Sequence, residues 1–197
     1  MVALQVKEDV YLVGTEQGLV HKCSKAYSSE YLASYSGHNM AAYSVRWNRI
    51  HGDVFLSASA DWTVKLWDGS KDGVAIKTFD MNTSVGDIAW APFSSTVFAV
   101  CTADGEVSVY DLGQSKHEPL CRQRIVKKAR LTKVAFNPKH PILLVGDDQG
   151  CVTSLKLSPN LRKHSIADTK EAFIEKEVQK LDDVISVALR SRPQETQ

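Results

Sequence analysis

The sequence has few cysteines, and they do not form any pattern that metal binding or disulfide formation requires. No two of the 4 cysteines make a Cys-x-x-Cys pair, which argues against a zinc site and against a disulfide framework. The four are Cys23, Cys101, Cys121 and Cys151. Since three of them fall in strand-like runs, we interpret them as small buried hydrophobic residues with reduced thiols.

Net charge and long apolar segments are also lacking. The 24 basic and 23 acidic residues leave a formal net charge of +1, so no global field attracts the chain to nucleic acid or to an anionic membrane. Residues 1–9 lack the basic segment and apolar run of a signal peptide. No run approaches the roughly 18 apolar residues of a membrane span. We therefore expect a soluble, cytoplasmic chain that binds neither nucleic acid nor membranes.

Catalytic motifs are missing as well: there is no nucleophile elbow, Walker-type loop, His-Glu-x-x-His motif or dinucleotide fingerprint. The segment Gly14–Gly18 has the glycines of a phosphate loop, but it lacks the lysine and lies in a predicted hairpin. His21 and Cys23 would need further metal ligands that the sequence does not indicate. We expect no catalytic residues, no cofactor and no metal, and we do not expect an enzyme.

What the sequence does contain is one pattern that occurs four times: an alternating apolar run, a polar turn and a second alternating run. The turn position falls at Gly18, Trp62, Gly105 and Gly150, so successive copies are 44, 43 and 45 residues apart. A period of about 40–45 residues with this pattern is typical of a β-propeller, in which each repeat forms one four-stranded sheet, or blade.

A short strand that ends in an aromatic residue precedes three of the four copies, and we predict that it is the innermost strand of its blade. These strands lie at Ser44–Asn48, Asp87–Pro92 and Lys133–Pro138. Polar outer strands are expected at Tyr31–Tyr35, Ala75–Phe79 and Leu120–Ile125. The predicted fold is all-β: a partial propeller of about three and a half four-stranded antiparallel blades over residues 1–160, entered at a second strand. Residues 161–197 are expected to form a linker and a carboxy-terminal α-helix.

The second copy carries residues that make it similar to the WD-repeat family. These residues are Gly37-His38, Ser57, Asp61 and the closing Trp67-Asp68. In that family a histidine, a strand serine, the turn aspartate and the tryptophan form a hydrogen-bonded tetrad, so that the polar members are linked when they are buried. The resemblance implies a structural tetrad of His38, Ser57 (or Ser59), Asp61 and Trp67. The third and fourth copies lack the closing Trp-Asp, so we expect this tetrad in one blade only.

Longer stretches narrow the resemblance to one branch of WD-repeat proteins. The runs 37–68, 85–92, 97–105 and 138–147 are similar to axonemal dynein intermediate chains, and Trp62 in the hairpin turn strengthens the match. The similarity extends from Val10 to Lys163 and is closer to the outer-arm subunit of cilia and flagella than to the cytoplasmic homologue. It implies the carboxy-terminal half of such a chain.

This resemblance implies a non-catalytic scaffold subunit of an axonemal dynein motor, whose propeller binds the tail of a dynein heavy chain and supports movement of the cilium or flagellum. It also implies contacts with a second intermediate chain and with light chains, microtubule association through the complex, and a location in the cytoplasm, cytoskeleton and axoneme. The alternative is a WD-repeat adaptor or substrate receptor that reads a peptide on the propeller face. Because propellers close with about four to eight blades, we expect a truncated or alternatively started chain that is poorly stable alone.

After Ser158-Pro159 the alternating period gives way to a helical one. The segment 168–171 predicts a capping box, and Arg190, Arg192 and Pro193 predict the helix end. The apolar residues between them fall on one stripe: Ile174, Val178, Leu181, Ile185 and Ala188. Two alternatives follow: an amphipathic helix that binds a partner, or a helix that folds back on the chain's own blades.

Basic residues cluster on the predicted outer strand of the third blade and on the loop after it. The cluster consists of Arg122, Arg124, Lys127, Lys128, Arg130 and Lys133. Such a cluster fits an acidic partner surface on a heavy chain or on tubulin, and it equally fits a solvated edge that prevents aggregation. Nucleic-acid binding is not indicated, because no aromatic residues for base stacking are interleaved with the basic ones.

Overall fold

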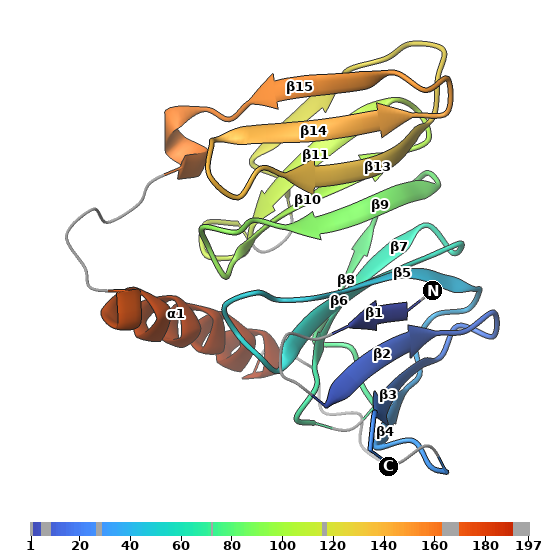
Figure 1. Ribbon diagram of the computed structural model, residues 1–197, viewed down its shortest axis with the longest axis vertical. Coiled ribbons are helices and arrows are strands. Elements are labelled where there is room, and N and C mark those ends of the chain that lie inside the picture. The colour runs from blue at the N-terminus through green and yellow to red at the C-terminus, as the bar shows by residue number, and fades with distance from the viewer. Residues whose placement is uncertain are drawn as a thin grey trace.

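The computed structural model describes residues 2–4, 9–26, 29–71, 73–115, 118–162 and 170–190. These residues form four antiparallel sheets, one short 3₁₀ helix and one α-helix. The sheets stand side by side, and α1 lies across one end of them (Figure 1). The predicted all-β partial propeller with a carboxy-terminal helix is confirmed.

Each sheet takes its strands from consecutive segments of the chain, and we number the sheets in chain order. Sheet 1 consists of β1 (Val2–Leu4), β2 (Val10–Gly14), β3 (Val20–Ser24) and β4 (Ala33–Tyr35). Sheet 2 consists of β5 (Ala42–Trp47), β6 (Val54–Ser59), β7 (Thr63–Asp68) and β8 (Lys77–Asp80). Sheet 3 consists of β9 (Val85–Trp90), β10 (Val97–Thr102), β11 (Glu106–Asp111) and β12 (Cys121–Arg124). Sheet 4 consists of β13 (Leu131–Phe136), β14 (Ile142–Asp147) and β15 (Val152–Lys156), and η1 (Pro159–Arg162) and α1 (Lys170–Arg190) follow it.

The strands lie where the sequence predicts them, with one exception in sheet 1. The innermost strands β5, β9 and β13 and the outer strands β4, β8 and β12 all overlap the segments predicted for them. We expected the chain to enter sheet 1 at a second strand, but Val2–Leu4 pairs antiparallel with β2 in the innermost position. A run of three residues is too short to show the alternation by which strands are recognised in a sequence.

The innermost strands of neighbouring sheets lie against one another: β1 against β5, β5 against β9, and β9 against β13. The middle strands β6 and β10 are buried at every residue, because neighbouring sheets cover both of their faces. Leu12, Leu56 and Ala99 hold equivalent positions in sheets 1–3 and are fully buried. Leu144, at the same position of sheet 4, is 39% exposed. This face of sheet 4 is therefore uncovered in the described part of the chain.

An aromatic residue of the outer strand joins two rings of the next sheet at the first two interfaces. Between sheets 1 and 2 the rings are Tyr35, Phe55 and Trp67, with centroids 5.0, 5.8 and 5.9 Å apart. Between sheets 2 and 3 they are Phe79, Phe98 and Tyr110, with centroids 5.3, 5.3 and 4.9 Å apart. Offset and edge-to-face aromatic pairs add to the stability that area burial supplies.

The third interface departs from this pattern. Gln123 occupies the register position in β12 that Tyr35 holds in β4 and Phe79 holds in β8. Its neighbours on sheet 4 are Leu143 and Leu155, which stand where the first two interfaces have rings. The smaller side chains leave a largely aliphatic cavity of about 170 Å³ between the two sheets. Sheets 3 and 4 are therefore packed less completely than the pairs before them.

We expect Gln123→Phe to raise the free energy of unfolding of the chain by about 1 kcal/mol, because the ring fills this cavity as Phe79 fills the preceding interface. Urea unfolding followed by circular dichroism measures the change. Gln123→Ser, which adds no apolar volume, is the matched control and is expected to leave stability unchanged or slightly lower. An unfolding free energy for Gln123→Phe at or below that of the wild type would contradict the prediction.

Tight hairpins join the second and third strands of every sheet, and one residue in each hairpin has a positive φ angle. Gly18, Gly105 and Gly150 have φ angles of 84°, 83° and 83°, which glycine adopts without strain. Trp62 holds the same position in sheet 2 with a φ angle of 66°. Because a side chain makes this conformation less favourable by about 1–2 kcal/mol, Trp62 departs from the local preference of the backbone.

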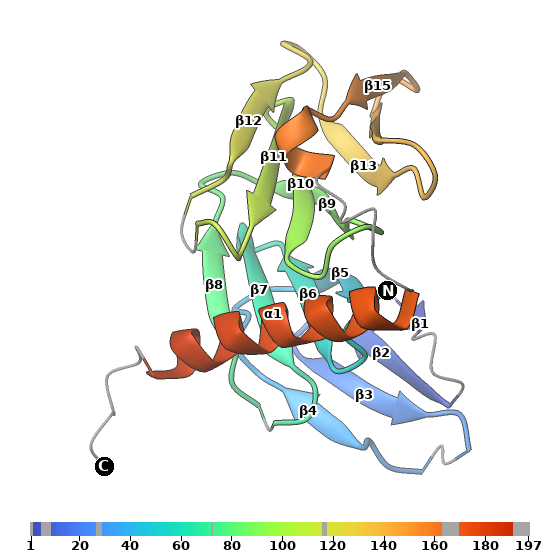
Figure 2. The same ribbon diagram turned by 90° about the vertical axis from the view of Figure 1, so that its left-hand side faces the viewer.

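The two ends of the sheets carry different loops. We call the end with the four hairpins the hairpin face. The loops between sheets lie on this face too, because hydrogen bonds join them to the hairpins, as from Ala60 N to Ala41 O and from Asp148 N to Arg130 O. We call the opposite end the helix face. It carries the turns 48–53, 91–96 and 137–141, and α1 runs across it, as Figure 2 shows.

Candidate functional site

The four predicted tetrad residues lie together in sheet 2 in one chain of hydrogen bonds. Trp67 Nε1 donates to Ser57 Oγ over 2.7 Å, Ser57 Oγ lies 2.6 Å from His38 Nε2, and His38 Nδ1 lies 3.0 Å from Asp61 Oδ2. An ionised carboxylate only accepts hydrogen bonds, so His38 donates from Nδ1 and accepts at Nε2 from the Ser57 hydroxyl. Every donor in this chain then has one acceptor.

Each residue of this site comes from a different element. Ser57 lies on β6, Trp67 on β7, His38 in the loop between β4 and β5, and Asp61 in the β6–β7 hairpin. The alternative residue, Ser59, does not belong to this series of hydrogen bonds, because its hydroxyl donates to the carbonyl of Met40.

Thr63 belongs to the site although the family pattern did not indicate it. Its amide and hydroxyl donate to Asp61 Oδ1 over 3.0 and 2.7 Å. An aspartate that accepts from the backbone two residues later is a common turn arrangement. The short spacing Asp61-Trp62-Thr63 was therefore the available signal.

Hydrogen bonds set the charge of Asp61, and burial sets that of His38. Burial raises the pKa of Asp61, but hydrogen bonds from Thr63, Asn39 and His38 outweigh burial and lower that pKa from 3.8 to about 2. Burial lowers the pKa of His38 below 6.5, and the neighbouring Asp61 opposes this only in part. At neutral pH, Asp61 is therefore ionised and His38 is neutral.

Serine, histidine and aspartate in this order also occur in hydrolases, where the serine attacks a substrate. Here Ser57 is fully buried, and its oxygen already accepts the Trp67 N–H. A nucleophile needs an open approach for the reacting carbonyl, and Ser57 has none in this structure. The arrangement therefore links four elements of sheet 2 and has no access to a substrate.

We expect acid to weaken the blade in two steps. The pKa of His38 is lower in the folded chain than in the unfolded chain, where it is 6.5. The contribution of His38 to stability is therefore full above pH 6.5 and is lost as the pH falls below that value. Folded Asp61 stays ionised, so its contribution is full above pH 3.8 and is lost between 3.8 and about 2. The Asp61 step corresponds to about 1–2 kcal/mol after allowance for solvent screening.

Asp61→Asn removes the second step and serves as its control. Urea unfolding across this pH range is expected to show a smaller fall of the unfolding free energy between pH 3.8 and 2 in Asp61→Asn than in the wild type. Equal falls in the two proteins would contradict the assignment.

A second buried polar site joins the innermost strands of three sheets. Asp87 of β9 is 1% exposed, and its Oδ1 accepts from Ser44 Oγ of β5 over 2.9 Å. Arg46 Nη2 lies 3.3 Å from the same oxygen, and Lys133 Nζ of β13 lies 3.5 Å from Oδ2. Burial and the neighbouring Asp87 raise the pKa of the Cys101 thiol to about 12. Sequence reasoning placed Lys133 in the basic cluster and missed this site.

The apolar stripe of α1 packs largely on the chain's own blades. Leu181 is fully buried and Ile185 is 4% exposed, both within the core between sheets 2 and 3. Val178 is half-buried, Ala188 packs at the edge of that core, and Ile174 is 39% exposed. Of the two alternatives for the helix, the second one, folding back on the blades, applies to Leu181 and Ile185. These two side chains are therefore not available to a partner in this conformation. The helix ends at Arg190, whereas residues 168 and 169 of the capping box lie outside the described residues.

Polar contacts fix α1 across the turns of the helix face. Glu177 accepts at its carboxylate from Ser94 Oγ over 2.9 Å and from the Ser95 amide over 2.6 Å. The Ser95 hydroxyl donates to the Glu177 carbonyl over 2.6 Å. One turn further along, Asp182 lies 3.1 Å from His51 Nε2. The helix thus contacts turns of both sheets 2 and 3.

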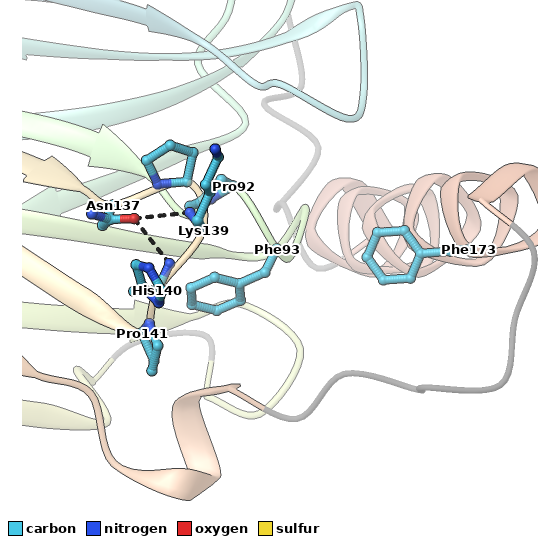
Figure 3. Close-up of a pocket in the computed structure, with 8 residues that line it drawn as sticks. Pro92, Phe93, Asn137, Lys139, His140, Pro141 and Phe173 are labelled. Carbon is cyan, nitrogen blue, oxygen red and sulfur yellow. Dashed lines mark hydrogen bonds between the residues drawn. The ribbon is translucent and has the colours of Figure 1, made fainter.

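The first turns of α1 face a hollow of the helix face at sheets 3 and 4. Phe173 of the helix and Phe93 of the 91–96 turn line it, together with the turn 137–141 (Figure 3). Asn137 Oδ1 accepts from the amides of Lys139 and His140 over 2.9 Å each, which gives this turn its shape. The lining combines aromatic and proline rings with Lys139 and His140, and it contains no carboxylate or thiol.

The predicted basic cluster does not act as one unit. Arg122 Nε lies 2.9 Å from Glu106 Oε1, and Arg124 Nη2 lies 3.4 Å from Asp104 Oδ2, so both arginines are paired within sheet 3. Lys127, Lys128 and Arg130 are exposed in the loop between β12 and β13. Within the described part of the chain, no carboxylate lies in ion-pair distance of Lys127 or Lys128.

Chemistry-bearing groups are otherwise scattered. Among the described residues no three histidine, cysteine or acidic side chains are grouped as a metal ion would require. Cys23 and Cys101 are buried, whereas Cys121 on β12 and Cys151 in a hairpin are exposed, contrary to our expectation of burial. No described helix has the length and apolar character that crossing a membrane would need.

Comparison with known proteins accounts for the repeat. The family described as "WD domain, G-beta repeat" matches residues 29–68 and 73–111. Each matched segment contains the outer strand of one sheet and the three inner strands of the next, namely β4 with β5–β7 and β8 with β9–β11. The second copy, which carries the tetrad, lies within the first match.

Whole-sequence comparison finds relatives over nearly the entire chain. The chain is 55% identical over 94% of its length to the 78 kDa intermediate chain of the flagellar outer-arm dynein of Chlamydomonas reinhardtii. It is 53% identical over 90% to the ciliary dynein intermediate chain 2 of Heliocidaris crassispina, and 50% identical over 90% to dynein axonemal intermediate chain 1 of Bos taurus. The chain spans about a quarter of the length of these relatives: 27%, 26% and 26%. The chain therefore contains WD repeats and is homologous over most of its length to axonemal dynein intermediate chains.

Proposed function

We propose that this chain is part of a non-catalytic scaffold subunit of an axonemal dynein. The observation that carries the proposal is its 55% identity, over 94% of its length, to an outer-arm dynein intermediate chain of a flagellum. We place it accordingly in the axoneme of a cilium or flagellum, within the cytoskeleton, where it supports movement of that organelle.

The fold supports a binding role for the chain. Rigid sheets that are linked by buried polar sites present loops at two ends, and loops on a rigid scaffold are common partner-binding surfaces. We propose that these surfaces bind the tail of a dynein heavy chain. The complex would also contain a second intermediate chain and light chains, and it would provide the association with microtubules. The burial of Ser57 is consistent with a non-catalytic subunit.

Affinity capture tests the proposal. The protein is tagged at its own locus in a ciliated cell, axonemes are extracted with salt, and the tagged complex is analysed by quantitative mass spectrometry. We expect dynein heavy chains and other intermediate and light chains in fixed proportion to the tagged protein. Capture of unrelated proteins without any heavy chain would contradict the proposal and would favour a WD-repeat adaptor.

A further inference from the structure

The tip of the β6–β7 hairpin combines an unfavourable backbone with an exposed aromatic side chain. Trp62 has a φ angle of 66° where the other three hairpins have glycine, and it is 51% exposed. Burial in the core therefore does not compensate for the conformation. A residue that is both strained and exposed indicates a role other than folding.

The hairpin that carries Trp62 is held firmly. Asp61 accepts hydrogen bonds from Asn39, His38 and Thr63, and the Trp62 amide donates to the Ser59 carbonyl over 3.2 Å. The tetrad thus fixes the backbone at Trp62 and with it the position of the indole. A rigid aromatic residue loses little conformational freedom when a partner covers it, which favours tight binding.

A second exposed apolar residue lies beside Trp62. Met40, in the loop between β4 and β5, is 54% exposed, and its carbonyl accepts from the hydroxyl of Ser59. Ser59 therefore contacts the backbones of both residues. Met81, half-buried, donates its amide to the Trp62 carbonyl over 3.0 Å. We call Met40, Trp62 and Met81 the apolar patch of the hairpin face.

Lys127 and Lys128, which have no ion pair among the described residues, lie on the same face, one sheet further on. The loop with Lys127 and Lys128 is joined to the β10–β11 hairpin by hydrogen bonds from Ile125 and Val126 to the carbonyl of Gly105. The carboxylates nearest to it in sheet 3, Asp104 and Glu106, are already paired with arginines. Lys127 and Lys128 therefore offer a partner two exposed amines, beside the carboxylate of Asp148, which accepts from the Arg130 amide over 3.1 Å.

We propose that the hairpin face of sheets 2 and 3 binds an acidic protein segment of another subunit of the motor complex. An apolar side chain of that segment covers the apolar patch, and its carboxylates pair with Lys127 and Lys128. This inference rests on the proposed function, since it assigns a surface and a partner chemistry to the scaffold role. The acidic surface of tubulin is the competing source of carboxylates, and the experiment separates the two.

The test uses the protein tagged at its own locus and compares single and double variants by quantitative capture. Trp62→Gly is expected to keep the fold, because glycine suits the φ angle of 66°, and to reduce recovery of its partner subunit by about tenfold or more. Lys127→Glu with Lys128→Glu is expected to reduce recovery about tenfold, and by less at high salt. Val187→Ala, at a position of α1 that is 43% exposed, and Lys139→Glu, on the helix face, are matched controls expected to capture as the wild type does.

Zero-length carbodiimide crosslinking identifies the source of the carboxylates, because it joins lysine amines to acids in direct contact. Crosslinks from Lys127 or Lys128 to one dynein subunit, lost in Trp62→Gly, are the expected result. Crosslinks to tubulin alone, or undiminished capture by folded Trp62→Gly, would overturn the inference and leave the proposed function standing. A wild-type protein that captures no dynein subunit would overturn both.

Discussion

Trp67→Ala is expected to lower the free energy of unfolding of sheet 2 by about 3–5 kcal/mol. Trp67 is fully buried between sheets 1 and 2, stacked 5.9 Å from Phe55 and edge-on at 5.8 Å to Tyr35. Removing the indole leaves a cavity at this interface. It also removes the donor to Ser57, whose hydroxyl remains buried. The loss combines packing with hydrogen bonding and is the largest expected for a single residue here.

Hydrogen exchange followed by mass spectrometry measures this loss locally. Blades contact only their neighbours, so the effect is expected in sheet 2 and β4 and is expected to fade in sheet 4. Trp67→Phe, which keeps most of the ring but lacks the N–H, should lose about 1–2 kcal/mol. Protection of β6 and β7 that equals the wild type in Trp67→Ala would contradict the role assigned to the tetrad.

Asp87→Ala is expected to cost about 2–4 kcal/mol, because one carboxylate joins three strands from three sheets. Its loss leaves the Ser44 hydroxyl, 1% exposed, without its acceptor, and leaves the Arg46 and Lys133 charges without theirs. Lys133 is 62% exposed and can rehydrate, which keeps the loss below that of a fully buried ion pair.

Asp87→Asn separates charge from shape. The amide can still accept from Ser44, so the variant should retain part of the stability that Asp87→Ala loses. Exchange protection should fall together in β5, β9 and β13, which the carboxylate links. A loss confined to β9, or a change below about 0.5 kcal/mol, would show that the innermost strands do not depend on Asp87.

The parts of the fold that could be predicted are those with a local signal. Hairpin turns at Gly18, Gly105 and Gly150 recur with the blade period, and glycine marks each positive φ angle. Short apolar or alternating runs bounded by turn residues locate the inner strands, including β6 and β10, which are buried at every residue. The tetrad could be named because the WD-repeat pattern records His38, Asp61 and Trp67.

What could not be predicted depends on contacts between blades. Ser44, Asp87 and Lys133 hold matching positions on adjacent innermost strands, but a single sequence does not show that three different polar residues meet there. The side on which α1 packs was equally open. An apolar stripe predicts that one side of the helix is buried, but it does not identify the surface that buries it. The hydrogen bonds from Ser94 and Ser95 to Glu177 form only when the turns of the helix face are assembled.

The most direct test of the dynein assignment is electron cryotomography of axonemes from cells that lack this protein, with and without the tagged protein restored. Homology to an outer-arm intermediate chain predicts that dynein-arm density is reduced or absent without the protein, and that it returns with the tag located within the arm. Intact arms in the deletion strain, or a restored tag located away from every dynein arm, would contradict the assignment.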